Sequence, residues 1–166
     1  MTQKTFNVLV LCTGNSARSI FGEALFNHLG RGRVRAFSAG SKPTGRVNPT
    51  ALETLEKHGI AVSDARSKSW DEFAVPGGLT FDFIFTVCDN AANEACPVWP
   101  GHPATAHWGI PDPAHVEPME ARVEAFETAY RQLKRRVEAF LALPLETMSA
   151  EEAKAAAKRI HMEAGQ

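Results

Sequence analysis

Apolar runs and helical patterns alternate along this chain of 166 residues. Short apolar runs, of the length and composition expected of buried strands, occupy residues 8–11, 34–37, 81–87 and 104–107. Stretches that favour helix lie between and after them, at residues 17–29, 48–58, 70–74 and 117–143. Such an alternation is typical of a parallel sheet covered by helices on both faces. We therefore predict an α/β fold of three layers, α/β/α, around a four-stranded parallel sheet.

Capping signals set the start of two helices. Asn48 stands before Pro49, an order typical of a cap residue followed by proline in the first turn. Ser149 and Glu152 have the spacing of a capping box, and mostly strong helix formers follow at residues 153–160. We expect residues 1–145 to form the main domain, and residues 146–166 to form a helical tail that packs on the surface through few contacts.

Composition and charge fit one domain without a charged macromolecular partner. With 44% hydrophobic and 22% charged residues, the chain can bury one sizeable core. Its net charge is −1, and it has no basic cluster for nucleic acid, no apolar run of membrane-spanning length and no signal segment at its start. We therefore expect a cytoplasmic monomer that binds neither nucleic acid nor membrane. Its three cysteines, an odd number, favour reduced thiols over a structural disulfide framework.

The segment from Cys12 to Arg18 carries the strongest chemical signal. It joins the first predicted strand to the first predicted helix, at the edge of the sheet where open α/β folds bind ligands. Backbone N–H groups of such a loop converge at the positive end of the helix, where they bind an oxyanion such as phosphate or arsenate. Cys12 would lie beneath the anion as a thiolate nucleophile, and Arg18 would hold two of its oxygens with a planar fork. The expected oxyanion-binding residues are Thr13, Gly14, Asn15, Ser16, Ala17 and Arg18.

Polar side chains in and after this loop are expected to support it. Asn15 tolerates a positive φ and would fix the unusual backbone, whereas Ser16 and Ser19 could hydrogen-bond the Cys12 sulfur. A nucleotide-binding loop is set aside, because Gly14 is not followed by Gly-Lys-Ser or Gly-Lys-Thr at the required spacing. The simplest alternative is that Cys12 ends a buried strand and has no chemical role.

The other two cysteines, Cys88 and Cys96, follow the third predicted strand. That strand ends at the same sheet edge as the loop, which places both thiols near Cys12. Small and polar residues between them would let the segment rearrange, so that Cys88 reaches Cys12 and Cys96 then reaches Cys88 by thiolate attack on sulfur. A zinc site is disfavoured, because structural zinc sites prefer a closer cysteine pair and a second pair elsewhere. Two unrelated buried thiols are the alternative.

Asp112 lies between Pro111 and Pro113, after the last predicted strand. Proline on both sides makes this loop stiff. A carboxylic acid held above a bound oxyanion could protonate the departing oxygen, which a displacement at phosphorus or arsenic needs near neutral pH. The alternative is a turn that merely uses an Asp-Pro pair.

Together these motifs resemble the low-molecular-weight protein tyrosine phosphatases and the arsenate reductases that share their fold. The matching landmarks appear in the family's order at residues 37–40, 47–49, 58–60 with Ser63, 66–68, 85–89 and 108–113. The resemblance covers residues 6 to about 143. Within the family, Cys88 followed by Cys96 and Pro97 is similar to the reductase branch. The resemblance implies the low-molecular-weight phosphatase-like fold and a general acid at Asp112.

The resemblance implies an arsenate reductase, a thiol-dependent oxidoreductase that serves arsenic detoxification. Cys12 would attack arsenate, Cys88 would attack the Cys12 sulfur as arsenite leaves, and Cys96 would then take over Cys88. The resulting Cys88–Cys96 disulfide would be reduced by an external dithiol protein such as thioredoxin, although related enzymes use glutathione with glutaredoxin or mycothiol. No cofactor is implied, and phosphate or sulfate would compete with arsenate.

Two other functions stay open. A phosphatase would hydrolyse aryl phosphates through a Cys12 phosphoenzyme, with Asp112 protonating the phenolate. Phosphatases of this family usually wall the pocket with aromatic residues, whereas residues 41–46 contain none and the only tyrosine, Tyr130, falls in a predicted helix. A noncatalytic anion-binding or redox-sensing module would keep the loop and need no acid.

The resemblance also bears on cations. In some arsenate reductases, residues matching Asn15, Glu23 and Ser38 help to coordinate a potassium ion. The position that resembles that site's aspartate is Lys68 here, whose ammonium could replace the cation by pairing with Glu23. We therefore expect no metal site and an activity largely independent of potassium.

Overall fold

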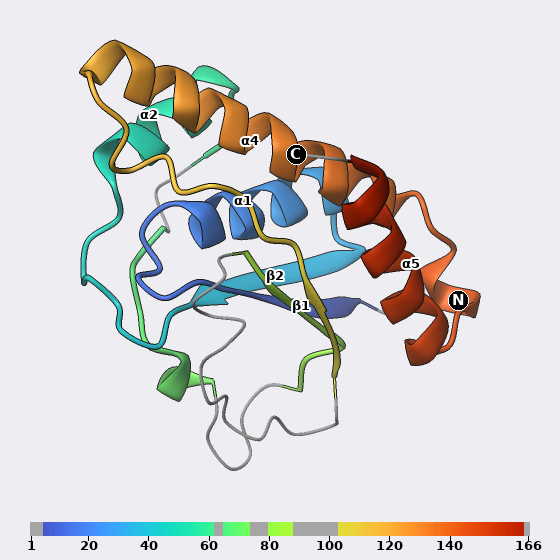
Figure 1. The fold of residues 1–166 in the computed structure, drawn as a ribbon. Helices are drawn as coiled ribbons and strands as arrows, with labels where there is room; N and C mark the ends of the chain where they lie inside the picture. Colours follow the sequence, from blue (N-terminus) through green and yellow to red (C-terminus); the bar gives the residue numbers. More distant parts are fainter. Residues whose placement is uncertain (1–4, 62–64, 74–79, 88–102, 165–166) are drawn as a thin grey trace.

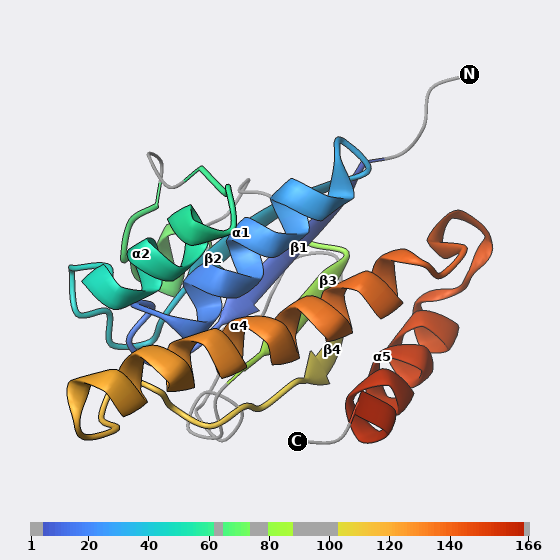
Figure 2. The same ribbon diagram turned by 90° about the horizontal axis from the view of Figure 1, so that it is seen from above.

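The computed structural model describes residues 5–61, 65–73, 80–87 and 103–164. Helices and strands alternate along the chain, and the long helices lie over one side of the sheet (Figures 1 and 2). The elements in chain order are β1 (Phe6–Leu11), α1 (Arg18–Gly30), β2 (Val34–Ala39), α2 (Pro49–Lys57), η1 (Trp70–Glu72), β3 (Phe83–Thr86), β4 (Ala104–His107), α4 (Met119–Leu141), η2 (Leu145–Thr147) and α5 (Ala150–Ala164).

The four strands form one parallel sheet in the order β2-β1-β3-β4. At its carboxyl edge, Leu11 of β1 lies opposite Ala39 of β2 and Thr86 of β3. The predicted four-stranded parallel sheet is therefore confirmed. The segment that follows Leu11 starts between two neighbouring strands, which hold it from both sides.

Alternate residues of β1 face two different apolar clusters. Val8 and Val10 face the main core, which they share with residues of α1 and α4. Leu9 and Leu11 face the opposite side of the sheet, where they pack with Phe73, directly after η1. Both faces of β1 are buried, as expected of a central strand in a parallel sheet.

Helix boundaries follow the capping residues. Asn48 Oδ1 accepts hydrogen bonds from the N–H groups of Thr50 at 2.9 Å and Ala51 at 3.4 Å, which confirms the predicted cap of α2. α4 begins at Met119, two residues later than predicted, because Pro118 before it is extended, with ψ at −172°. The helix predicted at 70–74 is the single 3-10 turn η1. No helix in the described parts of the chain is long and apolar enough to cross a membrane.

The tail helix α5 packs more closely than expected from the sequence. Its predicted capping box is confirmed, since Glu152 N–H donates to Ser149 Oγ at 3.1 Å and Ser149 N–H donates to Glu152 Oε1 at 2.8 Å. The expectation of few contacts is wrong, because Ala153 and Ala157 belong to the main core. Their small side chains let α5 lie against β4 and α4. The buried indole of Trp108 donates from Nε1 to the Ala157 carbonyl at 2.9 Å, which ties the edge of the sheet to the tail.

Arg33, directly before β2, binds the segment between α4 and α5. Its guanidinium donates to the carbonyls of Leu141 and Leu143 and makes two bonds with the Glu146 carboxylate, at 2.7 and 3.0 Å. The hydrogen bonds from Arg33 lower the pKa of Glu146 from its ordinary value of 4.5 to about 2. A carboxyl whose pKa is lower in the folded state stabilises that state above its unfolded pKa, and the stabilisation is lost as the pH falls through the folded value.

We expect Glu146→Gln to remove this part of the acid sensitivity. The variant should unfold at a slightly lower urea concentration than wild type at pH 7, and the two midpoints should converge between about pH 4.5 and about pH 2. Urea unfolding at a series of pH values measures this, with the exposed Glu56 of α2, replaced by glutamine, as the control. A constant difference between wild type and Glu146→Gln across that range would show that the carboxylate charge is not involved.

Candidate active site

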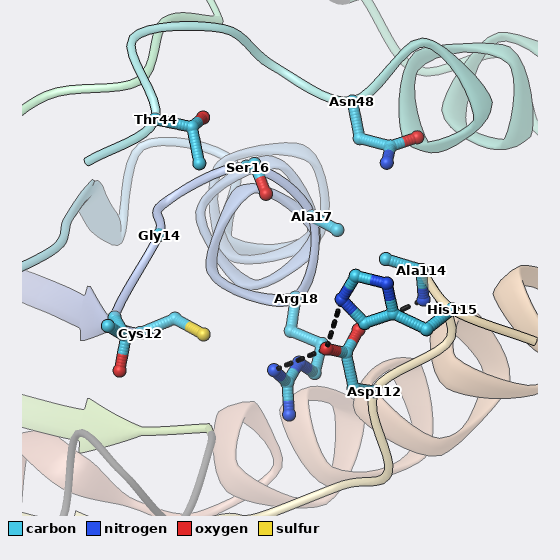
Figure 3. Close-up of a pocket in the computed structure, with 11 residues that line it drawn as sticks. Cys12, Gly14, Ser16, Ala17, Arg18, Thr44, Asn48, Asp112, Ala114 and His115 are labelled. Atoms are coloured by element: carbon cyan, nitrogen blue, oxygen red, sulfur yellow. Dashed lines mark hydrogen bonds and ion pairs between the residues drawn. The ribbon is translucent and has the colours of Figure 1, made fainter. Parts of the chain in front are cut away.

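The segment between β1 and α1 forms one wall of a cavity of about 390 Å³ at the carboxyl edge of the sheet. Figure 3 shows the Cys12 sulfur pointing into this cavity, on the side of Arg18 and Asp112. The lining residues are Cys12, Thr13, Gly14, Ser16, Ala17, Arg18, Thr44, Asn48, Asp112, Ala114 and His115. The structure thus brings together three elements that lie far apart in the sequence: the loop after β1, the segment before α2 and the loop before α4.

Backbone carbonyls of the loop are held from outside by the segment that leads into α2. The three bonds run from Lys42 N–H to Thr13 O at 3.0 Å, from Thr44 N–H to Gly14 O at 3.0 Å and from Asn48 N–H to Ser16 O at 2.8 Å. In a trans peptide the N–H points away from the carbonyl of the same unit. The N–H groups of Gly14, Asn15 and Ala17 are therefore directed away from this outer segment. Such an array of N–H groups at the start of a helix suits a bound anion.

Asn15 fixes the conformation of the loop through its backbone and its buried side chain. Its backbone φ is 47°, in the left-handed region predicted for this position, and its side chain is completely buried. The amide donates to Ser19 Oγ at 2.8 Å and accepts a bond from Lys68 N–H at 2.8 Å. Ser19, expected beside the Cys12 sulfur, is buried and bonded to Asn15.

Gly40, at the end of β2, allows the loop to lie close to that strand. A Cβ atom at this position would lie 2.3 Å from Thr13 O and 2.7 Å from Cys12 O, well inside normal contact distance. Since the obstacle is backbone and not a flexible side chain, Gly40→Ala must displace the loop. We expect it to lower the free energy of unfolding by about 1–3 kcal/mol. We expect phosphate affinity to fall by about tenfold or more, because the loop N–H groups would no longer point toward one anion position.

Thermal unfolding with and without phosphate measures both effects of Gly40→Ala. Gly14→Ala is the comparison for stability, because its added Cβ would meet the Thr44 methyl group at 3.3 Å, and a side chain can move. If Gly40→Ala keeps the stability and the phosphate affinity of wild type, the close contact between Gly40 and the loop does not hold the loop in place.

Arg18 and Asp112 lie next to each other in the lining of the cavity (Figure 3). Arg18 Nη1 donates to the Ile110 carbonyl at 3.0 Å, and Nη2 lies 3.5 Å from Asp112 Oδ2. Asp112 Oδ1 accepts a hydrogen bond from Ala114 N–H at 2.9 Å, which orients the carboxyl group. The Asp112 side chain is 40% exposed and the Arg18 side chain 15%, so the carboxyl group reaches solvent while the guanidinium is largely enclosed.

Three further predicted residues, Glu23, Ser38 and Lys68, form a polar cluster. Lys68 Nζ lies 3.5 Å from Glu23 Oε1, 3.4 Å from Ser38 Oγ and 2.9 Å from the Arg66 carbonyl. Ser38 Oγ donates to Glu23 Oε1 at 2.5 Å. Burial lowers the pKa of the Lys68 ammonium, while the nearby Glu23 carboxylate acts in the opposite direction. The ammonium therefore lies among the oxygen atoms of Glu23 and Ser38.

Two predicted residues lie outside the described part of the chain, namely Cys88 and Cys96. The last described residue before them, Val87, donates its N–H to Leu11 O at 3.0 Å, directly before Cys12 in the sequence. Within the described ranges, no group of three or more histidine, cysteine, aspartate or glutamate side chains could hold a metal ion.

Four lining residues were not among the predicted site residues: Thr44, Asn48, Ala114 and His115. Thr44 and Asn48 reach the cavity because their N–H groups bind the loop carbonyls, a contact that no spacing in the sequence reveals. The sequence could have indicated His115, because an Asp-Pro turn brings the third residue after the aspartate back toward the aspartate side chain.

The arrangement suits displacement at a tetrahedral oxyanion. A thiol lies at the end of β1, backbone N–H groups and a guanidinium can hold the oxygens, and a carboxyl group is placed to donate a proton. Tyr130, by contrast, is buried in the core against Phe21, away from the lining residues. No phenylalanine, tyrosine or tryptophan is among the residues that line the described cavity.

Comparisons with known proteins agree with the observed fold. The family model described as low molecular weight phosphotyrosine protein phosphatase matches residues 7–154. An arsenate reductase of Shouchella clausii is 34% identical over 134 residues, which cover 80% of this chain and 93% of that protein. A solved arsenate reductase in the phosphate binding state has a TM-score of 0.61 at 26% identity, covering 82% of this chain and 97% of that one. A thioredoxin-dependent arsenate reductase of Corynebacterium glutamicum has a TM-score of 0.55 at 25% identity, covering 83% of this chain and 64% of that one.

Proposed function

The chain belongs to the low molecular weight phosphotyrosine protein phosphatase family, and from this premise we propose that it is an arsenate reductase, which converts arsenate to arsenite in arsenic detoxification. The observation that carries the proposal is the cavity in which Cys12, Arg18 and Asp112 meet without an aromatic wall. The relatives named as arsenate reductases support the same reaction.

In the first step, Cys12 forms a bond to arsenic. Arsenate binds with its oxygens on the loop N–H groups and the Arg18 guanidinium, which hold negative charge without rearranging. The Cys12 thiolate attacks arsenic, and Asp112 gives its proton to the departing oxygen, which leaves as water. The hydrogen bond from the Ala114 N–H to Asp112 Oδ1 supports this role, because it orients the carboxyl group.

In the second step, the thiols supply the electrons. The Cys88 thiolate attacks the Cys12 sulfur, the sulfur–arsenic bond breaks, and its electron pair passes to arsenic, which is released as arsenite. A Cys12–Cys88 disulfide remains. Cys96 then attacks Cys88, which restores the Cys12 thiolate and leaves a Cys88–Cys96 disulfide. An external dithiol protein, with thioredoxin as our first candidate, reduces that disulfide.

A phosphatase is the second candidate, because the same loop and acid can cleave a phosphate ester. Cys12 would take the phosphoryl group and water would release it. The cavity has no aromatic ring of phenylalanine, tyrosine or tryptophan in its described lining to grip an aryl group. We therefore expect only weak hydrolysis of aryl phosphates.

Steady-state turnover separates the two candidates. With thioredoxin, thioredoxin reductase and NADPH, the protein should form arsenite from arsenate, and phosphate and sulfate should compete. Replacing thioredoxin by glutathione and glutaredoxin tests the other reductant. Fast aryl phosphate hydrolysis without arsenite formation under either system would assign the chain to the phosphatases.

We also expect the reaction to be largely independent of potassium. The Lys68 ammonium already lies beside Glu23 and Ser38, where it supplies the positive charge that a cation would bring. Rates in potassium chloride and sodium chloride of equal ionic strength should agree within about twofold, the range that general screening can produce. Several-fold stimulation by potassium over sodium would contradict this role of Lys68.

A further inference from the structure

His115 lines the reaction cavity and has no part in the reaction described above. It follows Asp112 by three residues, and the bond from Ala114 N–H to Asp112 Oδ1 turns the chain back so that the imidazole lies beside the carboxyl group (Figure 3). None of the motifs in the sequence includes it. Its position raises the question of what a histidine contributes at the mouth of an oxyanion site.

Two basic side chains approach the same oxygen of Asp112. Arg18 Nη2 lies 3.5 Å from Oδ2, and His115 Nε2 lies 3.8 Å from it. His115 is freer to turn than Arg18, because the His115 side chain is 88% exposed whereas Arg18 also donates a hydrogen bond to the Ile110 carbonyl. An exposed side chain loses few contacts when it turns, so His115 can move toward an anion that enters the cavity.

The charges around the cavity favour a second cation. Among the described lining residues Arg18 is the one permanent cation, whereas the Cys12 thiolate and the Asp112 carboxylate are both negative when ionised. A dianionic ligand adds two more negative charges. Glu117, two residues after His115, is paired with Arg122 at 3.1 Å.

We propose that His115, as an imidazolium, is a second cationic contact for the bound oxyanion. The proposal rests on the proposed function in that its ligand is the oxyanion of the same cavity. Histidine is the residue type whose charge ordinarily changes between about pH 5 and 8, so an imidazolium contact is expected to strengthen oxyanion binding in acid solution relative to alkaline solution. Exposed charge pairs contribute little, so the expected effect on affinity is about threefold.

Sulfate binding to the reduced full-length protein tests this role without turnover. Sulfate is a tetrahedral dianion across the whole range, so the ligand itself does not titrate. His115→Gln should weaken sulfate binding about threefold at about pH 6 and leave it unchanged at about pH 8.5. His115→Lys should bind sulfate with wild-type affinity at the lower pH and more tightly than wild type at the higher pH.

The control is His28→Gln, which removes an exposed histidine from the opposite end of α1 and should not change sulfate affinity. Equal weakening by His115→Gln at both pH values would mean a structural role, and an unchanged affinity at the lower pH would mean no role; either result overturns the proposal. Failure of His115→Lys to restore binding at the lower pH also overturns it. Since arsenite formation is not measured, the proposed reduction can fail while this binding result stands.

Discussion

Cys12→Ser is expected to lower arsenate reduction by more than about 10⁴-fold. A serine hydroxyl is almost fully protonated near neutral pH and is a much weaker nucleophile than a thiolate, so the bond to arsenic does not form. The hydroxyl also cannot pass on an electron pair through a disulfide. Oxyanion binding should stay within a few-fold of wild type, because the loop N–H groups and Arg18 are unchanged.

Two measurements on Cys12→Ser check these expectations. Arsenite formation over hours gives the rate, and the rise in unfolding temperature on adding phosphate reports binding. If the variant keeps more than a few per cent of wild-type turnover, another group must attack arsenic. If phosphate no longer stabilises it, the variant has lost its loop structure, and Cys12→Ala provides the second test of the nucleophile.

Asp112→Asn is expected to lower the turnover number by about 10²–10⁴-fold. The asparagine amide keeps the shape of the side chain but has no acidic proton for the departing oxygen. Phosphate should inhibit the variant at least as well as it inhibits wild type, because Arg18 Nη2 no longer has a carboxylate at 3.5 Å that competes for it. A loss in turnover without a loss in binding is the mark of a proton donor.

The exposed Asp71 of η1, replaced by asparagine, is the matched control for loss of a carboxylate. It should leave both the turnover number and phosphate inhibition unchanged. An unchanged rate in Asp112→Asn would indicate that a different group donates the proton.

Features set by local backbone chemistry could be predicted from the sequence. Asn15 tolerates the positive φ of 47° that the loop requires, and Asn48 caps the helix that starts with Pro49. Buried strands are also predictable, because β1 needs apolar residues on both faces. These signals lie within a few residues of the feature that they determine.

Features that depend on distant partners were harder to predict. The packing of α5 rests on Ala153 and Ala157 meeting the core and on the Trp108 indole donating to the tail, and small residues give no such signal in a sequence. Thr44 enters the cavity through a backbone bond to Gly14, which any residue type except proline could make. Cys88 and Cys96 stay predictions from the sequence and the family resemblance.

The most direct test of the proposed reduction is a single turnover without external reductant. The purified reduced protein is mixed with arsenate, and arsenite and remaining thiols are counted. We predict one arsenite per chain with the loss of two thiols, and no arsenite release from Cys88→Ser. No arsenite and no loss of thiols, together with rapid hydrolysis of an aryl phosphate, would contradict the reductase and make the protein a phosphatase.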